Sequence, residues 1–539
     1  MSNSNYSITY ALLRRCAFIY ITLPLFCFLI GWLKWYWVIL SCAALIACLL
    51  FSDKNNRILR LLTKENKTID SPANEGFKLI ISKWKVFAIA AVSCVYCVFC
   101  GIGRLWAQSD DYTYRNALFR DLILRDWPVF YDKYDGALAY YIGMWLPPAI
   151  PGKLTYLISG NPDTAFFAGN ISLLIYFTIG FTLLFLLLLL VFRTAKTKQI
   201  LLIMIGFFLF SGMDIIGNRL SVDGLHIEWW AGFGTFQYSS FTTCICWVFN
   251  QTLIPWICTV LLLHEKTVSN YVMIGMACLL CGPFPFVGFF IYCVAIAIKR
   301  IVDMIKAGTI KSFVKEAASV SNICAALFIF PFIGSYLTSN TFMSNTTVEE
   351  TVSNTNVGNI DQVLLLIFFL LIEFGIYAML IAIVNKKNYL FYATILQLCF
   401  YPLINIGVYS DFTMRASIPA LFMMYALCYQ YLVNKSALVP GIFAAPAKSK
   451  TKKRTSSEIS IPYVVLICFL IIGAVTPCVE LARGVVQVQE RGIDDISTDY
   501  IVTFNRESHP LGEDEFWPQT NFVALDYEDK PFYKYFARR

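Results

Sequence analysis

The apolar segment from Ile171 to Phe192 constrains this chain most, because it contains the almost unbroken run LLFLLLLLVF. A helix needs roughly 20 apolar residues to cross a bilayer whose hydrocarbon core is about 30 Å thick, and many other segments of the chain reach that length. Hydrophobic residues make up 58% of the sequence and charged residues only 14%, whereas soluble domains are roughly one quarter charged. The sequence therefore predicts an all-α, polytopic membrane protein that cannot fold as a soluble globule.

The net charge of +8 comes from Lys and Arg clusters that lie between apolar runs, where membrane proteins keep them on the cytoplasmic side. Basic residues do not alternate with aromatic residues along a soluble face, so no nucleic-acid partner is expected. Arg14 and Arg15 precede the first apolar segment, but no small-residue cleavage site follows. We expect the first helix to remain as an anchor in a multi-pass protein of the cell (plasma or inner) membrane, with the lipid bilayer around it.

Apolar length and Lys/Arg asymmetry together predict about 13 transmembrane helices. Two N-terminal membrane helices and a basic cytoplasmic loop occupy residues 1–85, and a transmembrane core occupies residues 86–480. The core carries two long outer loops, 106–168 and 218–249, and residues 481–539 form a small extracytoplasmic region.

The segment from Tyr271 to Ile298 is ambiguous. A single helix would place the basic residues from Lys299 onward outside, whereas two short helices broken at Gly282, Pro283 and Pro285 keep them inside. We predict the broken hairpin, because short Pro-interrupted segments at membrane depth often line a cavity.

The first outer loop is about 60 residues long, well beyond the usual connection. Arg115–Trp127 alternates charged and apolar residues, which predicts an amphipathic helix on the membrane surface. Ala137–Trp145 repeats the pattern with Tyr140 and Tyr141, before three prolines (Pro147, Pro148 and Pro151) break it. This loop is interpreted as an aromatic belt at the interface, as a floor for a lipid-linked substrate, or as both.

Three acidic residues are candidate catalytic groups. Asp110 and Asp111 stand at the outer mouth of the third span, where a carboxylate is either a solvated helix-end charge or a general base. The second carboxylate of the pair could orient the first or hold a divalent cation, although the sequence requires no cofactor. Asp214 lies inside the apolar run FFLFSGMDIIG, where a carboxylate is costly and is a functional hypothesis by default; the alternative is a structural pair with Arg219 or a Lys.

The second outer loop contains the motif HIEWWAGFGTFQYSS. His226 and Glu228 are too few ligands to predict a metal site, but they suit acid–base chemistry or hydrogen bonds to a sugar. The neighbouring residues Trp229, Trp230, Gln237 and Tyr238 are candidates for sugar contacts, since flat aromatic faces stack on sugar rings. Anchoring at the membrane interface is the alternative for these aromatic residues.

The cysteines predict no metal site and no regular disulfide framework. Cys94, Cys97 and Cys100 have the spacing C-x-x-C-x-x-C, but they lie in an apolar run, where cysteine usually acts as a small apolar packing residue.

Asp411 and Arg415 occupy a tight outer turn, DFTMRASIP. A guanidinium binds phosphate through two parallel hydrogen bonds and stays charged, so Arg415 is a candidate phosphate ligand. An ion pair between Asp411 and Arg415, four residues apart, is the alternative.

This layout resembles the GT-C class of integral membrane glycosyltransferases. The stretch SDDYTYRNALFRDLILRDWPVFYD is similar to the first outer loop of bacterial members, and DFTMRASIPA is similar to the arginine turn found late in several of them. The resemblance covers the topology of most of the chain, although its motifs are short. Two features depart from the simplest pattern: two extra helices precede the loop that bears the aspartates, and the C-terminal outer region is small.

The resemblance implies transfer of a sugar from a polyprenyl-phosphate-linked donor to a glycan or lipid acceptor of the cell envelope. Asp110 or Asp111 would act as the general base in an inverting reaction. Arg415 would bind the donor phosphate, with Arg115 and Arg219 as helpers.

Two other functions fit a protein of this composition. A polysaccharide polymerase or ligase would share the outer arginines, but its large loop usually comes late in the chain, whereas the largest loop here comes early. A transporter or flippase for a lipid-linked saccharide needs a site near the midplane and some repeat symmetry. The polar residues cluster at one face and no internal repeat is evident, which favours an enzyme.

Overall fold

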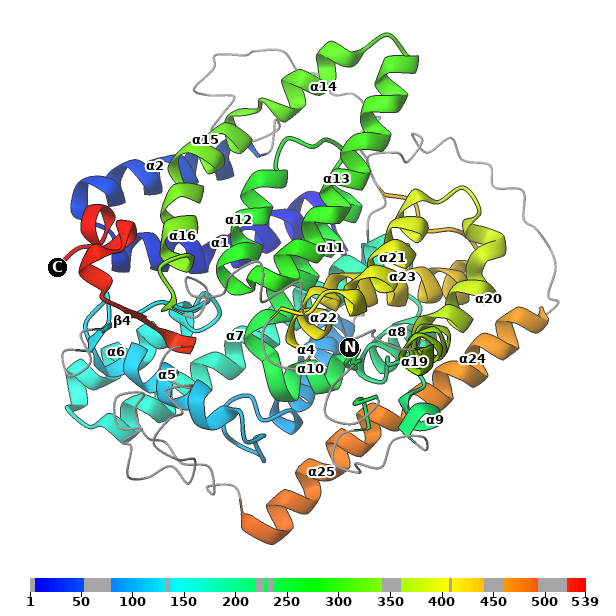
Figure 1. Ribbon diagram of the computed structural model, residues 1–539, viewed down its shortest axis with the longest axis horizontal. Helices are drawn as coiled ribbons and strands as arrows, with labels where there is room; N and C mark the ends of the chain where they lie inside the picture. The colour runs from blue at the N-terminus through cyan, green and yellow to red at the C-terminus, as the bar shows by residue number, and fades with distance from the viewer. Residues whose placement is uncertain are drawn as a thin grey trace.

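The computed structural model describes residues 5–52, 79–131, 136–218, 227–230, 236–341, 360–406, 410–440, 460–492 and 521–539. Most of these residues lie in helices (Figure 1), so the predicted all-α class is confirmed. Two small antiparallel sheets add a minor β component.

The helices and strands have the following bounds. The first half of the chain forms α1 (Tyr10–Trp32), α2 (Trp35–Phe51), α4 (Lys83–Phe99), α5 (Tyr112–Leu124), α6 (Leu146–Ser159), α7 (Pro162–Val191), α8 (Thr197–Phe208), α9 (Asp214–Asn218), α10 (Phe241–Val248), η3 (Phe249–Gln251) and α11 (Leu253–His264). The second half forms α12 (Tyr271–Cys281), α13 (Pro283–Lys306), α14 (Ile310–Ala317), α15 (Val320–Phe328), α16 (Phe330–Leu337), α19 (Ile360–Leu370), η4 (Leu371–Gly375), α20 (Ile376–Asn385), α21 (Tyr389–Phe400), η5 (Tyr401–Leu403), α22 (Asp411–Ala416), α23 (Ile418–Asn434), α24 (Ile461–Gly473), α25 (Val475–Arg491), η8 (Tyr527–Asp529) and η9 (Phe532–Phe536). The strands are β1 (Asn5–Ile8), β2 (Leu79–Ser82), β3 (Phe130–Tyr131), β4 (Gly136–Leu138) and β5 (Val523–Leu525).

Within the described residues, six helical segments are long and apolar enough to cross a membrane. They are α1, α7, α13, α15 with α16, α19 with α20, and α24 with α25. A further pair, Phe241–Gln251 and Leu253–His264, is apolar enough as a unit but bends by 100°. The chain is therefore compatible with a helical membrane protein, while the number of 13 spans stays a prediction.

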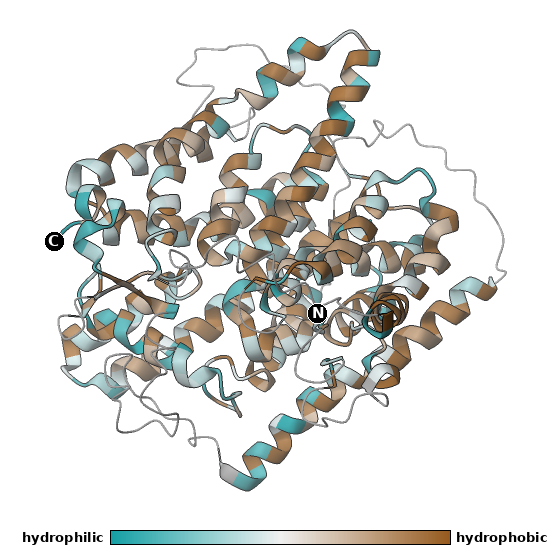
Figure 2. Ribbon diagram, in the orientation of Figure 1, coloured by the Kyte–Doolittle hydropathy of each residue, from teal (hydrophilic) through white to brown (hydrophobic). Residues whose placement is uncertain are grey.

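Several helices expose apolar side chains, and Figure 2 shows that α24 consists mostly of hydrophobic residues. On α13, for example, Phe290, Val294 and Ile298 are 53%, 38% and 57% exposed and follow one another at helical i, i+4 spacing. Soluble monomers rarely expose large continuous apolar patches. Lipid would cover these faces in a bilayer.

The helix ends that carry basic loops meet one another. The Arg14 guanidinium donates to the Ser52 carbonyl oxygen at 3.1 Å, and the Lys85 ammonium donates to the Ala195 carbonyl oxygen at 2.9 Å. These contacts join the beginnings of α1 and α4 to the residues that follow α2 and α7. The positive-inside rule predicts that these loops share the cytoplasmic side of the membrane, and this topology stays a prediction.

The chain from Tyr271 breaks at Gly282 as predicted, but only α12 is short, since α13 has 24 residues and continues past Ile298 to Lys306. Gly282 separates α12 from α13 and has an extended backbone conformation. A side chain at Gly275 of α12 would lie 3.2 Å from Phe286 and 3.6 Å from Phe289 of α13. Since Gly275 and Phe289 flank the break at equal distance along the chain, the two helices run antiparallel.

The first outer loop differs from the amphipathic surface helices that its sequence predicts. Arg115–Trp127 does contain a helix, α5, but most residues of α5 are buried. The helix can be buried because its charges are paired: Asp121 accepts hydrogen bonds from Arg125 at 3.2 Å and Tyr131 at 3.0 Å.

The prediction of a second surface helix over Ala137–Trp145 is also wrong. This segment begins within strand β4 and continues through turns. Pro147 and Pro148 do not end a helix but lie in the first turn of one, α6, where a missing backbone N–H costs nothing, and Pro151 lies inside the same helix. The apolar run FFLFSGMDIIG around Asp214 is not one continuous helix, since α8 ends at Phe208 and the chain is not helical from Phe210 to Met213.

The last described residues, 521–539, pack against the first outer loop and the end of α1. β5 pairs antiparallel with β4, with Ala524 opposite Ala137. The Arg538 backbone N–H donates to the Trp32 carbonyl oxygen at 3.0 Å, and η9 lies against α16 (Figure 1). Residues far apart in the sequence therefore build this part of the molecule together.

The buried ion pair between Arg14 and Glu265 should be essential for stability. Glu265 accepts from Arg14 through both carboxylate oxygens, at 2.5 and 2.8 Å, and from Asn270 at 2.9 Å. Removing one partner leaves an unpaired buried charge, which costs about 3–5 kcal/mol, so Arg14→Leu should lower the melting temperature in detergent strongly. The half-exposed pair of Lys299 and Asp303 is the control: Lys299→Leu should change stability by roughly 1 kcal/mol or less. Equal melting temperatures for the two variants would contradict this assignment.

Candidate functional site

Two ion pairs from distant parts of the sequence converge on one side of the molecule. Asp111 precedes the first residue of α5, and its carboxylate lies 2.9 Å from Nη2 of Arg115, one turn later. The Arg115 side chain is 7% exposed, whereas that of Asp111 is 44% exposed. Arg115 is thus held inside the protein, while the carboxylate of Asp111 stays accessible.

The second ion pair lies in α22. Asp411 and Arg415 are 2.9 Å apart, with side chains 29% and 14% exposed, so the ion pair that the i, i+4 spacing suggests is present. α22 is fixed at its centre, because the Thr413 hydroxyl donates to the Tyr401 carbonyl oxygen at 3.0 Å. At its end, the Ala416 carbonyl oxygen lies so close to Gly288 of α13 that a Cβ there would sit 2.3 Å away.

Tyr140 and Tyr141 connect this site to the first outer loop. The Tyr141 hydroxyl oxygen accepts a hydrogen bond from Nη1 of Arg415 at 3.1 Å and another from the Tyr140 hydroxyl. A phenolic oxygen that accepts two hydrogen bonds keeps its own hydrogen for a third group. Tyr141 can therefore donate a hydrogen bond to a bound ligand.

Asp111, Arg115, Tyr141, Asp411 and Arg415 are called the arginine–aspartate cluster below. The two ion pairs interact: burial raises the pKa of Asp411, Arg415 lowers it, and the charge of Asp111 raises it again. For Arg415, burial lowers the pKa, but Asp411 and its neighbours outweigh this effect and the pKa rises. Arg415 thus remains a cation.

The two arginines have more donors than the cluster satisfies. Nε and Nη1 of Arg115 and Nε of Arg415 are buried and have no hydrogen-bond partner among the residues that the structure describes. Buried donors without partners are rare in folded proteins and call for an explanation such as an absent ion or ligand. Guanidinium groups bind phosphate and carboxylate oxygens best, so the cluster is suited to bind an anion.

No family model, no curated protein and no solved structure gives a significant match to this chain. The functional assignment therefore depends on the geometry of the chain itself.

The other candidate catalytic residues lie apart from this cluster or outside the described residues. Asp110 is exposed at the surface, next to Asp111. Asp214 is fully buried in a separate group of acidic residues. Arg219 and His226 lie outside the described residues.

The residues predicted to contact a sugar are mostly covered by protein. Glu228 is 3% exposed and accepts a hydrogen bond from the Ser240 backbone N–H at 2.9 Å. Trp230 and Tyr238 are each 1% exposed, and both rings pack against Phe369. Their faces are filled by this packing and offer a sugar no open surface in this structure.

Trp229 and Gln237 lie beside these buried residues. Trp229 is partly exposed, and the side-chain amide of Gln237 donates to the Ser239 hydroxyl at 2.9 Å.

Two functional groups escaped the sequence analysis. Tyr141 was expected as part of an aromatic belt or of a floor for a lipid-linked substrate, but not as a partner of Arg415, because the two residues are 274 positions apart. Glu373 was not singled out, although a lone carboxylate in the apolar run LLLIFFLLIEFGIYAML is the signal that identified Asp214.

The described residues contain no group of three or more His, Cys, Asp or Glu side chains that could hold a metal ion. All 18 cysteines have free thiols.

The position of α22 should depend on the absence of a side chain at Gly288. In Gly288→Ala the new Cβ would meet the Ala416 carbonyl oxygen, which is backbone and cannot rotate away, so α22 must shift at a cost of about 1–3 kcal/mol. The control is Gly334→Ala in α16, where the nearest atoms are 3.6 Å away in a side chain; this change should be neutral or stabilise by up to roughly 1 kcal/mol. Thermal unfolding in detergent measures both, and a Gly288→Ala protein as stable as wild type would contradict the close approach.

Proposed function

We propose that this protein is a membrane-embedded glycosyltransferase of the GT-C type. It transfers a sugar from a polyprenyl-phosphate-linked donor to a glycan or lipid acceptor of the cell envelope. One observation carries the proposal: Asp111 and Arg115 from the first long loop lie beside Asp411 and Arg415 from a turn about 300 residues later, and the guanidinium groups have unused donors. These are a base and an anion site side by side, as an inverting transfer from a phosphate donor requires.

The arginines and Tyr141 would bind the donor phosphate. Nε and Nη1 of Arg115 and Nε of Arg415 can each donate to a phosphate oxygen without breaking the ion pairs with Asp111 and Asp411. The free hydrogen of Tyr141 adds a fourth donor. Because these donors are mostly buried, their attraction for the phosphate is stronger than it would be in water.

Asp111 would be the general base, because its carboxylate is accessible and lies beside the anion site. The acceptor hydroxyl gives its proton to Asp111, and its oxygen forms a bond to the anomeric carbon of the donor. The bond between that carbon and the phosphate oxygen breaks on the opposite side of the sugar. The polyprenyl phosphate leaves with the electron pair and is stabilised by Arg115, Arg415 and Tyr141.

The first functional prediction concerns the base. Asp111→Asn keeps size and polarity but cannot accept the proton, so turnover should fall on the order of 100-fold or more. The matched control is the neighbouring Asp110→Asn, which should keep most of its activity because Asp110 lies outside the cluster. Sugar transfer from a polyprenyl-phosphate donor by the purified protein in nanodiscs measures both. Full activity in Asp111→Asn would exclude this residue as the base.

Arg415→Lys should also reduce turnover strongly, since an ammonium cannot reproduce the planar set of donors. Arg300, which is ion-paired with Glu316 at 2.7 Å on α14, provides a control, and Arg300→Lys should leave transfer unchanged. An active Arg415→Lys protein would contradict the phosphate role.

A second prediction concerns orientation. The proposal needs the arginine–aspartate cluster outside the cytoplasm, as the Lys/Arg distribution predicts. In a protein without other cysteines, Ser159→Cys at the exposed end of α6 should react with an impermeant maleimide in intact cells. Ser312→Cys on the exposed helix α14 should react only after permeabilisation. The reverse pattern would place the site on the cytoplasmic side and contradict the proposal.

A further inference from the structure

A second group of acidic side chains lies where α9, η4 and α25 meet, and the proposed transfer reaction does not use it. Asp214 begins α9 and is 0% exposed, and Glu373 lies in the π-helical turn η4 and is 2% exposed. A single π-helical turn inside an α-helix is rare and often marks a functional site.

The two carboxyl groups leave one oxygen each without a donor. Oδ2 of Asp214 accepts hydrogen bonds from Ser211 at 2.9 Å and Thr476 at 2.8 Å, and Oε1 of Glu373 accepts one from Trp230 at 3.1 Å. The remaining oxygens, Oδ1 of Asp214 and Oε2 of Glu373, are buried with no hydrogen-bond partner among the described residues.

The side chains of Asp214 and Glu373 lie within hydrogen-bonding reach of each other. A single hydrogen between the two carboxyl groups would satisfy both, since a protonated carboxyl is a donor and an ionised one is an acceptor. Two adjacent carboxylates cannot both ionise in a buried site, because the like charges repel each other strongly there.

The surroundings of the pair supply little positive charge. Among the described residues, the cation facing this group is Arg483 of α25, and it is already paired with Glu480 at 3.0 Å. The other titratable side chains that interact with the group are Tyr377 of α20, Tyr238, and Cys244 of α10.

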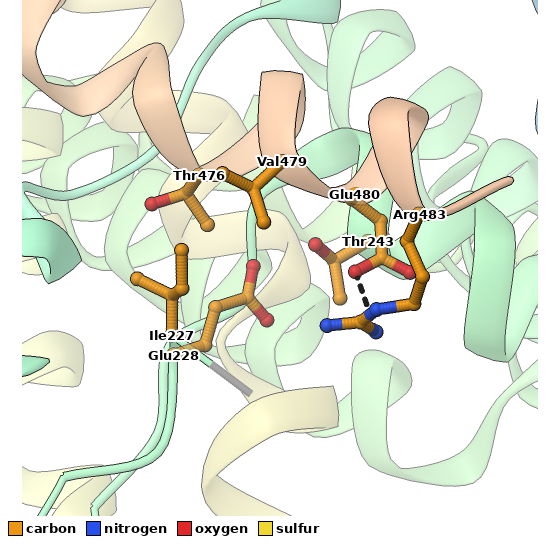
Figure 3. Close-up of a pocket in the computed structure, with 7 residues that line it drawn as sticks. All are labelled: Ile227, Glu228, Thr243, Thr476, Val479, Glu480 and Arg483. Atoms are coloured by element: carbon orange, nitrogen blue, oxygen red, sulfur yellow. Dashed lines mark ion pairs between the residues drawn. The ribbon is translucent and has the colours of Figure 1, made fainter. Parts of the chain in front are cut away.

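Glu228 lies next to the pair and lines a small cavity, together with Ile227, Thr243, Thr476, Val479, Glu480 and Arg483 (Figure 3). Its carboxyl group points toward α25 in this view. Burial raises the pKa of Glu228 to about 8, and the charge of Asp214 adds to the rise. Thr476 lines the cavity and donates a hydrogen bond to Asp214, and Arg483, which also lines the cavity, has a side chain that is 26% exposed.

We propose that this group is a proton-binding site: Asp214 and Glu373 share one proton, Glu228 holds a second, and the cavity beside α25 is the path by which protons enter. The bound protons let three carboxyl groups pack together and hold α25 against the core through Thr476. The inference is independent of the transfer reaction, because none of these residues belongs to the arginine–aspartate cluster.

The infrared spectrum of the purified full-length protein in nanodiscs tests the site. Protonated carboxyl groups have a C=O stretching band that shifts on exchange into heavy water. Wild type should show this band at neutral pH, and Asp214→Asn and Glu373→Gln should each remove the part that belongs to the shared proton. Asp361→Asn is the matched control: Asp361 is an exposed carboxylate at the start of the same span as Glu373, so this variant should leave the band unchanged.

A second measurement uses Glu228 and does not require the pair to be altered. Because the pKa of Glu228 is higher in the folded state, the protonated side chain stabilises the folded protein. This stabilisation is complete at low pH and is lost as pH rises through about 8. The melting temperature of wild type should therefore fall between about pH 4.5 and about pH 8 and level off above that, and Glu228→Gln should reduce this fall.

Two results would overturn the proposal. One is the absence of a protonated carboxyl band in wild type at neutral pH. The other is a band that appears only in Arg219→Gln, which would show that Arg219 pairs with ionised carboxylates instead. Because the wild-type spectrum alone decides the first result, the proposal stays testable even if an Asp214 variant does not fold.

Discussion

Every buried charge in this chain must find its partner inside the protein, and the rest of the structure depends on that constraint. Arg14 and Glu265 join the beginning of α1 to the end of α11. Asp121 lets α5 enter the core by pairing with Arg125 and Tyr131. The contact between Arg14 and Glu265 decides that α1 and α11 are neighbours, because apolar side chains pack against lipid or protein almost equally well.

The same constraint separates the two polar groups by chemistry. The arginine–aspartate cluster balances two cations against two anions and still has unused donors, so it can take up an additional anion. The group around Asp214 has acidic side chains with unused acceptors, so it can take up protons. One set of buried polar residues thus suits a phosphate and the other suits hydrogen ions.

The sequence was informative where a signal was local. Apolar length predicted the helical class, and Gly282 with Pro283 and Pro285 predicted the break between α12 and α13. It failed where long-range contacts overrode the local pattern. α5 has the composition of a surface helix but is buried, because it packs against α6 and α7.

The candidate site shows the same division. Asp111, Arg115, Asp411 and Arg415 could be chosen from residue type and position in the predicted loops. Their convergence could not, since it depends on how α13 packs against α22 at Gly288. Tyr141 could not be identified at all without the fold, because nothing in the sequence near it indicates a contact with Arg415.

The pairing of β5 with β4 has a consequence for the order in which the molecule is assembled. The Asn340 amide donates to the carbonyl oxygens of Ala139 and Asn521, and the Ala139 backbone N–H donates to the Phe522 carbonyl oxygen. The strand that positions Tyr140 and Tyr141 is thus held by residues that the ribosome adds after α1–α25. A nascent chain in which all these helices are already inserted still lacks β5, so the segment that carries Tyr140 and Tyr141 is fixed only after α25 has been made.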